Sequence, residues 1–151
     1  MSPNSEIEIL LIEDNPYDAE LALRTLRQHN LANHIVHLND GAEALDWLFG
    51  SAGQPGCGPV TYPRVVLLDL KLPKVNGLEV LRAIRADKRT AHLPVVIMTS
   101  SAEERDVVES YNLGANGYVV KPLDFESFST ALTSLGHYWL LVNRNPVNPR
   151  A

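Results

Sequence analysis

Residues 64–70 read RVVLLDL, an apolar run that ends at the carboxylate of Asp69. Four aliphatic residues in a row predict a strand that is covered on both faces, as in a parallel sheet with helices on each side. Four further runs have this character, the last of them more weakly: IEILLI at 7–12, LPVVIMT at 93–99, NGYVVKP at 116–122 and HIVHL at 34–38. The chain therefore contains five candidate strands, spread over most of its length.

Helix-forming stretches separate these strands, and several have a recognisable beginning. The sequence DNP at 14–16 puts a proline at the start of a helix, where its missing N–H has no consequence. The segments DGAE at 40–43 and SAEE at 101–104 have the spacing of capping boxes. Asp124 is a candidate cap for the last helix.

Strands that alternate with helices in this way predict an α/β fold, because parallel neighbours need a crossover between them. We expect a five-stranded parallel sheet of order 2-1-3-4-5, with helices on both faces, as in flavodoxin-like proteins. The length of 151 residues suits one domain. We place this domain at 7–142, between an N-terminal lead at 1–6 and a C-terminal tail at 143–151.

Composition excludes several classes of protein. The net charge of −5, with no long basic cluster, argues against a general nucleic-acid binder. The single cysteine, Cys57, excludes an intramolecular disulfide. No apolar stretch approaches the roughly 20 residues of a membrane span, and the N-terminus lacks the features of a signal peptide. We therefore expect a cytoplasmic protein that does not bind membranes.

The segment 50–63, GSAGQPGCGPVTYP, predicts a long surface loop rich in glycine and proline. It is either a tolerated insertion or a loop that binds a partner. It does not predict a phosphate-binding loop, because prolines interrupt its glycines and no Lys-Ser or Lys-Thr pair follows.

Acidic residues follow two of the predicted strands. Glu13 and Asp14 come directly after the first strand, and Asp69 ends the third. The carboxyl ends of parallel strands meet at one edge of the sheet, so these three carboxylates should lie together. Such a group favours a hard cation such as Mg²⁺, with Asp14 and Asp69 as direct ligands and Glu13 bound through water. Taken alone, each acid could instead cap the turn that follows it.

A lysine and a hydroxyl follow the last two strands. Asp69 could act as a nucleophile towards phosphorus, and Lys121 and Thr99 could then bind the phosphoryl oxygens. Lys121 could otherwise be a solvated residue at a strand end, and Thr99 a residue with high strand propensity. Pro122 could follow a cis peptide bond that directs Lys121 inward.

Four segments carry a family resemblance: LLIEDNPYDAE at 10–20, VVLLDLKLPKVNGLEVLRAIR at 65–85, LPVVIMTSSAEERD at 93–106 and GANGYVVKPLDFESF at 114–128. Together they resemble the receiver domain of two-component response regulators, over residues 7 to about 142. The resemblance implies that Asp69 accepts phosphate from a sensor histidine kinase. It also implies that Glu13 and Asp14 bind Mg²⁺, with the backbone carbonyl of Lys71 as the remaining protein ligand.

The same resemblance assigns roles to three further residues. Thr99 and Lys121 correspond to the hydroxyl and the lysine that bind the phosphoryl group. Tyr118 lies where the family keeps a switch aromatic, which turns inward after phosphorylation. A half-buried aromatic in a strand would give the same sequence.

A narrower resemblance is to the small stand-alone regulators paired with phytochrome-type histidine kinases. It rests on NPYDAELALRTL at 15–26, the long loop before the third strand and HYWLLV at 137–142. It implies a bacteriophytochrome as the partner kinase. Only nine residues follow Val142, too few for a DNA-binding domain, so we expect output through protein contacts. The alternative is a phosphorelay intermediate that passes phosphate to a histidine phosphotransfer protein.

Other classes fit less well. A phosphatase of the haloacid dehalogenase type needs a second acid two residues after its nucleophile, where this chain has Lys71. A flavin or nucleotide carrier needs a phosphate-binding loop after the first strand, but residues 13–16 are acidic. We therefore expect a signalling protein with only self-phosphorylation and self-dephosphorylation chemistry, and not an enzyme.

The last helix predicts self-association. Its apolar residues fall at 125, 128, 132, 135, 139 and 142, and we expect the first three of them to pack on the sheet. The five consecutive residues Tyr138, Trp139, Leu140, Leu141 and Val142 cannot all face the same core. Gly136 could bend the helix and move this segment away from the domain. We predict a homodimer that uses residues 138–142.

Overall fold

The computed structural model describes residues 7–31, 34–50 and 62–145. It contains one parallel sheet with the strand order β2-β1-β3-β4-β5. The strands are β1 (Ile9–Ile12), β2 (Ile35–Leu38), β3 (Val65–Leu68), β4 (Val95–Thr99) and β5 (Gly117–Val120). The predicted fold class and strand order are confirmed. The predicted lead at 1–6, most of the loop at 50–63 and the end of the tail lie outside the described residues.

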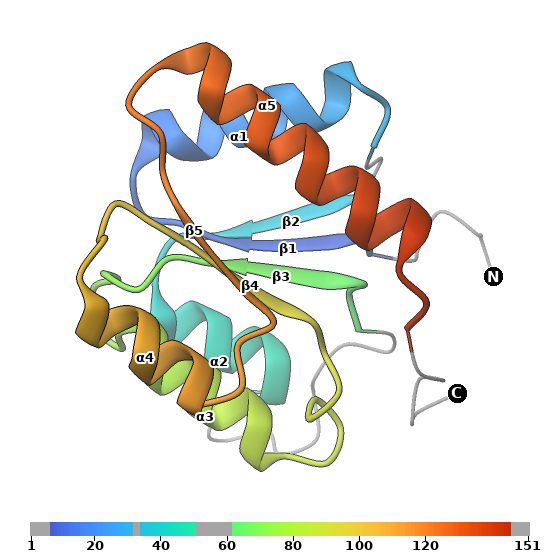
Figure 1. The fold of residues 1–151 in the computed structure, drawn as a ribbon. Coiled ribbons are helices and arrows are strands. Elements are labelled where there is room, and N and C mark those ends of the chain that lie inside the picture. Colours follow the sequence, from blue (N-terminus) through green and yellow to red (C-terminus); the bar gives the residue numbers. More distant parts are fainter. Residues whose placement is uncertain (1–6, 32–33, 51–61, 146–151) are drawn as a thin grey trace, which may run out of the picture.

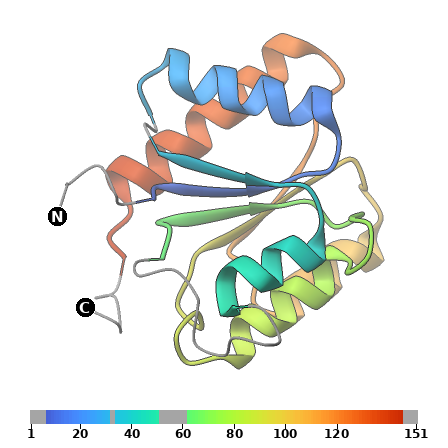
Figure 2. The same cartoon turned by 180° about the vertical axis from the view of Figure 1, so that it is seen from behind.

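Helices cover both faces of the sheet (Figures 1 and 2). One face carries α1 (Pro16–Gln28) and α5 (Phe125–Gly136), and the other carries α2 (Gly41–Phe49), α3 (Gly77–Ala86) and α4 (Glu104–Asn112). Among the described residues, no helix is both long and apolar enough to cross a membrane.

The central strands are buried on both sides because successive side chains point to opposite faces. In β1, Leu10 and Ile12 join the core beneath α2 and α3, whereas Ile9 and Leu11 join the core beneath α1 and α5. All four are at most 4% exposed. This explains the continuous apolar runs in the sequence.

Most of the predicted helix starts are confirmed. Asn15 caps α1 by accepting hydrogen bonds from two backbone N–H groups, with Pro16 as the next residue. Asp40 and Asp124 cap α2 and α5, each by accepting a hydrogen bond from one backbone N–H group. Each cap satisfies backbone donors that the first helical turn leaves free.

The predicted capping box at 101–104 is wrong. The N-cap of α4 is Glu103, which makes no side-chain capping bond. The hydroxyl of Ser101 instead accepts a hydrogen bond from the backbone N–H of Glu103 at 3.3 Å and donates one to Asp106 at 2.5 Å. The serine hydroxyl thus bonds to a backbone N–H two residues later and not to one three residues later, as a capping box requires. The helix therefore begins later, at Glu104.

The last helix differs from the predicted stripe. After α5 the chain continues as a π-helix, η2 (His137–Val142), in which Asn143 N donates to Tyr138 O at 2.7 Å. The wider turn of a π-helix changes which residues face the core. The buried positions are Phe128, Leu132, Gly136 and Leu140, four residues apart.

Two expectations for this helix are therefore wrong. Phe125 does not pack on the sheet, because its side chain is 52% exposed. Gly136 does not bend the helix away, since its backbone stays helical. A Cβ at Gly136 would lie 2.9 Å from Leu31 Cδ1 and 3.1 Å from Leu26 Cδ2. The glycine therefore lets the helix pass close to the end of α1.

Candidate functional site

The three predicted acids lie together at the carboxyl edge of the sheet. The pairing of Ile12 with Leu68 puts the residues that follow β1 and β3 side by side. One oxygen from each of Glu13, Asp14 and Asp69 lies within 4.8 Å of the others. Glu13 and Asp69 are buried, whereas Asp14 is exposed. The structure thus joins acids that are 55 residues apart in sequence, from Asp14 to Asp69.

Lys121 extends from the end of β5 into this group of acids. Its Nζ lies 2.6 Å from Glu13 Oε1 and 3.0 Å from Asp69 Oδ2, and its side chain is only 9% exposed. Its backbone N–H donates to Thr99 O at 2.7 Å, which fixes the start of the β5–α5 loop. The alternative of a solvated lysine at a strand end is therefore wrong. The Lys121–Pro122 peptide is trans, as are the other peptide bonds of the described residues.

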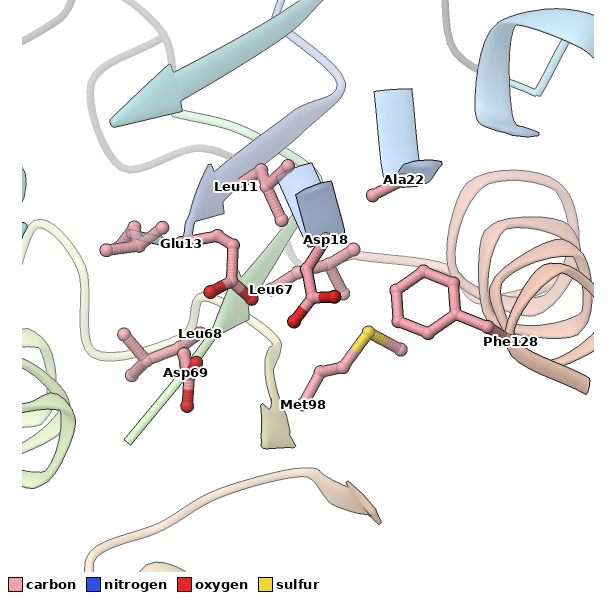
Figure 3. Close-up of a pocket in the computed structure, with 10 residues that line it drawn as sticks. Leu11, Glu13, Asp18, Ala22, Leu67, Leu68, Asp69, Met98 and Phe128 are labelled. Carbon is pink, nitrogen blue, oxygen red and sulfur yellow. The ribbon is translucent and has the colours of Figure 1, made fainter. Parts of the chain in front are cut away.

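A fourth carboxylate, that of Asp18, completes the surroundings of Lys121. Asp18 Oδ2 lies 2.8 Å from Lys121 Nζ. Asp18 belongs to the first turn of α1, and Figure 3 shows its carboxylate beside those of Glu13 and Asp69. Sequence reasoning missed this residue. An acid in the first turn of a helix is ordinarily explained by the helix dipole, but α1 begins at the same sheet edge as the other acids.

The electrostatics of the site show an excess of negative charge. Burial raises the pKa of Glu13 to about 7, opposed by its hydrogen bond from Lys121 and reinforced by the charge of Asp69. Burial alone would lower the pKa of Lys121, but hydrogen bonds to Asp18 and Glu13 and the charge of Asp69 raise it overall. Three carboxylates therefore lie around the ammonium of Lys121, and the carboxylate of Asp14 lies beside two of them. Oxygen donors with uncompensated charge fit a hard divalent cation such as Mg²⁺ or Mn²⁺.

The backbone after Asp69 is tightly held. Lys71 N lies 3.3 Å from Asp69 Oδ1, and Gly77 N donates to Leu70 O at 2.8 Å. A Cβ at Gly77 would lie 2.2 Å from Asp69 O, so α3 can begin here only with a glycine. This contact fixes the loop in which the backbone carbonyl of Lys71 was predicted to bind metal.

Thr99 lies at the same edge, at the end of β4, and is fully buried. Its hydroxyl oxygen accepts a hydrogen bond from Ser101 N at 3.4 Å. The hydroxyl of Thr99 is thus bonded to the β4–α4 loop. A group that attracted its hydroxyl would act directly on this loop.

Tyr118 contacts the same loop. Its ring is half-buried against the core beneath α2 and α3, and its hydroxyl donates to Ser101 O at 2.8 Å. Burial raises the pKa of this hydroxyl, partly offset by the hydrogen bond to Ser101. The backbone of Ser101 in this loop is therefore bonded to Thr99 through its N–H and to Tyr118 through its carbonyl oxygen.

A small cavity of about 10 Å³ lies behind the acids. Figure 3 shows Glu13, Asp18 and Asp69 on one side of it and the apolar Ala22, Met98 and Phe128 on the other. A volume of this size holds about one water molecule. The site therefore suits ions and small groups at its surface, and not an organic cofactor in its interior.

Comparisons with known proteins agree with this geometry. The family model of the response regulator receiver domain matches residues 9–133. The probable methanogenesis regulatory protein FilR2 of Methanothrix harundinacea is 41% identical over 138 residues, which cover 91% of this chain and 86% of FilR2. The response regulator Rcp1 of Synechocystis is 33% identical over 132 residues, which cover 87% of this chain and 88% of Rcp1.

Solved structures give the same result. The Mn²⁺-bound crystal structure of Rcp1 matches with a TM-score of 0.84 at 31% identity, covering 93% of this chain and 99% of Rcp1. The bacteriophytochrome response regulator AtBRR matches with a TM-score of 0.65 at 49% identity, covering 92% and 99%. The narrower resemblance predicted from sequence is thereby confirmed as a resemblance. A sheet of order 2-1-3-4-5, acids and a lysine at its carboxyl edge and a family match over 9–133 together make this chain a member of the response regulator receiver domain family.

Proposed function

We propose that this protein is a stand-alone response regulator in which Asp69 accepts a phosphoryl group from the phosphohistidine of a sensor kinase. The observation that carries the proposal is the position of the Asp69 carboxylate. It is buried, it lies beside two further acids, and its Oδ2 is 3.0 Å from Lys121 Nζ. Receiver domains are phospho-acceptor signalling domains, and their phosphate donors are histidine kinases.

The proposed metal is Mg²⁺, held by Asp14 and Asp69 directly, by Glu13 through water and by the backbone carbonyl of Lys71. When bound, this ion would neutralise charge on the phosphoryl oxygens. The fit rests on the oxygen donor set and on the excess of carboxylates over ammonium groups.

In the proposed reaction, a carboxylate oxygen of Asp69 attacks phosphorus. An O–P bond forms, the N–P bond to the kinase histidine breaks, and that histidine leaves with the electron pair. Lys121 and the hydroxyl of Thr99 bind phosphoryl oxygens and so stabilise the negative charge on these oxygens during the transfer. Their positions at the ends of β5 and β4 support these roles.

Phosphorylation is proposed to change the conformation of the protein, because the phosphoryl group makes more favourable contacts in one conformation than in the other. Attraction of Thr99 towards the phosphoryl group would release its bond to the Ser101 backbone. Tyr118 holds the same loop and would readjust with it. The alternative is a phosphorelay intermediate, in which Asp69 passes its phosphate to a histidine phosphotransfer protein.

A bacteriophytochrome is the proposed partner kinase. The 49% identity to the bacteriophytochrome response regulator AtBRR supports it, because that similarity extends over most of both chains. Transfer from a purified bacteriophytochrome kinase, compared with transfer from an unrelated histidine kinase, tests this pairing.

The C-terminal segment is proposed to form a homodimer. Leu140 is buried, but Tyr138, Leu141 and Val142 are 47%, 65% and 59% exposed. Trp139 packs edge-on against Tyr138 with ring centroids 4.9 Å apart. The proposed contact surface is therefore Tyr138, Leu141 and Val142, supported by Trp139.

Intact-mass measurement tests the central proposal. After treatment with a small phosphodonor and Mg²⁺, the protein should gain one phosphate, and Asp69→Asn should gain none. Omission of the divalent cation should also abolish the gain. An Asp69→Asn variant that still gained a phosphate would show that a different residue is the acceptor.

A further inference from the structure

Asp18 is the carboxylate of the site to which neither metal binding nor phosphoryl binding has been assigned. It is not among the acids whose oxygens lie within 4.8 Å of one another, yet its Oδ2 lies 2.8 Å from Lys121 Nζ. We propose that Asp18 is a positioning residue, which holds the ammonium group of Lys121 in place for the phosphoryl group. The inference rests on the proposed function of Asp69.

Each N–H donor of the Lys121 ammonium group has a carboxylate partner. An ammonium group has three N–H donors and no acceptor. Carboxylates of Glu13, Asp18 and Asp69 lie 2.6, 2.8 and 3.0 Å from Nζ, one for each donor. A phosphoryl oxygen can therefore reach this ammonium only if one of the three carboxylates gives up its bond.

The three carboxylates around Lys121 differ in whether they can keep this bond during phosphoryl transfer. Asp69 loses its charge when its oxygen becomes bonded to phosphorus, and Glu13 belongs to the group of acids proposed to hold the metal. Asp18 takes part in neither change. It is thus the one partner of Lys121 that can keep its bond before, during and after phosphoryl transfer.

The backbone of Asp18 is held in place by the helix cap of α1. Asp18 is part of the first turn of α1, and its backbone N–H donates to Asn15 Oδ1 at 3.1 Å. Lys121, by contrast, carries its charge on a flexible four-carbon chain. A carboxylate on a capped helix gives that chain a fixed end point. The side chain of Asp18 is 28% exposed, so its replacement leaves the core intact.

The variants for the test are Asp18→Ala, which removes the acceptor, and Asp18→Asn, which keeps an acceptor oxygen without the charge. Glu20→Gln is the matched control, because Glu20 lies on the same helix and pairs with the exposed Arg24. Unfolding by urea should give similar midpoints for all three variants and the wild type.

The first measurement uses the metal-free, unphosphorylated protein. The ammonium ¹H–¹⁵N signal of Lys121, assigned with Lys121→Met, should be visible in the wild type and in Glu20→Gln, because three bonds slow its proton exchange. It should broaden or vanish in Asp18→Ala. A signal in Asp18→Ala as sharp as in the wild type would overturn the proposal, whether or not Asp69 accepts phosphate.

The second measurement is the rate at which acetyl phosphate phosphorylates Asp69 in the presence of Mg²⁺. Asp18→Ala should lower this rate roughly tenfold, because the ammonium loses its position, and Asp18→Asn should recover most of it. In a Lys121→Met background, Asp18→Ala should cause no further loss. A tenfold loss that persisted without Lys121 would mean that Asp18 acts by a different route and would refute the positioning role. A wild type that takes no phosphate would refute the proposed function instead.

Discussion

The hydroxyl of Tyr118 donates a hydrogen bond to the backbone carbonyl oxygen of Ser101 at 2.8 Å. This bond joins β5 to the β4–α4 loop, and Thr99 holds the same loop through the backbone N–H of Ser101. Two residues with proposed switch roles therefore act on one backbone segment. Any change at Thr99 should be felt at Tyr118 through Ser101.

Removal of the Tyr118 hydroxyl should loosen this loop. Tyr118→Phe keeps the half-buried ring but leaves the Ser101 carbonyl without this donor, and the free energy of unfolding should fall by about 1 kcal/mol. Hydrogen exchange at the backbone amides of 100–103 should become faster. Tyr111→Phe is the control, because Tyr111 is 51% exposed. Equal effects of the two substitutions would show that the bond to Ser101 has no special role.

Thr99→Ala should separate phosphorylation from its response. Asp69 should still accept phosphate, because its own carboxylate and Lys121 are unchanged. The NMR shifts that phosphorylation induces on the surface formed by α4, β5 and α5 should become smaller, because the hydroxyl that links the phosphoryl group to Ser101 is gone. Shifts of the same size and pattern as in the wild type would contradict the proposed switch.

Stability should depend on pH through Glu13. Burial raises its pKa from 4.5 to about 7, so the folded protein holds this proton more tightly than the unfolded chain. The free energy of unfolding should therefore fall by about 3 kcal/mol as the pH rises from the unfolded pKa to beyond the folded pKa of Glu13. At higher pH it should change little. Because Mg²⁺ needs the carboxylate, saturating Mg²⁺ should reduce the fall.

Urea unfolding without divalent cations, at about pH 5 and about pH 8, measures this effect. Glu13→Gln cannot ionise at this position, so its stability should lack the fall that the wild type shows. Glu20→Gln should behave like the wild type. If the free energy of unfolding of Glu13→Gln fell by the same amount, a titratable group other than Glu13 would be the cause.

Gly77→Ala should disrupt the loop after Asp69. The new Cβ would lie 2.2 Å from Asp69 O and 2.7 Å from Leu70 Cα, both of them backbone atoms that cannot move aside. We expect a loss of about 3 kcal/mol or more of unfolding free energy, with slower phosphorylation of Asp69. Gly117→Ala is the control, since its Cβ would make an ordinary contact of 3.6 Å with Val96. Similar losses in the two variants would exclude the contact as the cause.

Self-association should depend on the exposed residues of η2. Leu141→Ser/Val142→Ser should shift sedimentation equilibrium towards the monomer at micromolar concentration, because both side chains are more than half exposed in a single chain. Val108→Ser, at an apolar position on α4 that is 48% exposed, should leave the equilibrium unchanged. A wild type that stays monomeric with and without phosphate would assign this surface to another partner.

The fold and most of the site follow from local sequence patterns. Continuous aliphatic runs such as 65–68 identify strands that are buried on both faces, and the alternation with helices makes the sheet parallel. Parallel strands bring their carboxyl ends to one edge, which is why the sequence alone predicts that Glu13, Asp14, Asp69 and Lys121 lie together. The helix start at 14–16 and the caps at Asp40 and Asp124 could be predicted because they depend on a few neighbouring residues.

Other features depend on packing between segments that are distant in the sequence. Asp18 became a partner of Lys121 because the side chain of Lys121, 103 residues later in the chain, reaches the first turn of α1. Ser101 left its predicted cap because its hydroxyl reached Asp106 and its carbonyl reached Tyr118. The last helix widened into a π-helix, so that Leu140 became buried and Val142 stayed exposed. A local sequence pattern cannot determine such choices, because each depends on which surface the rest of the fold presents.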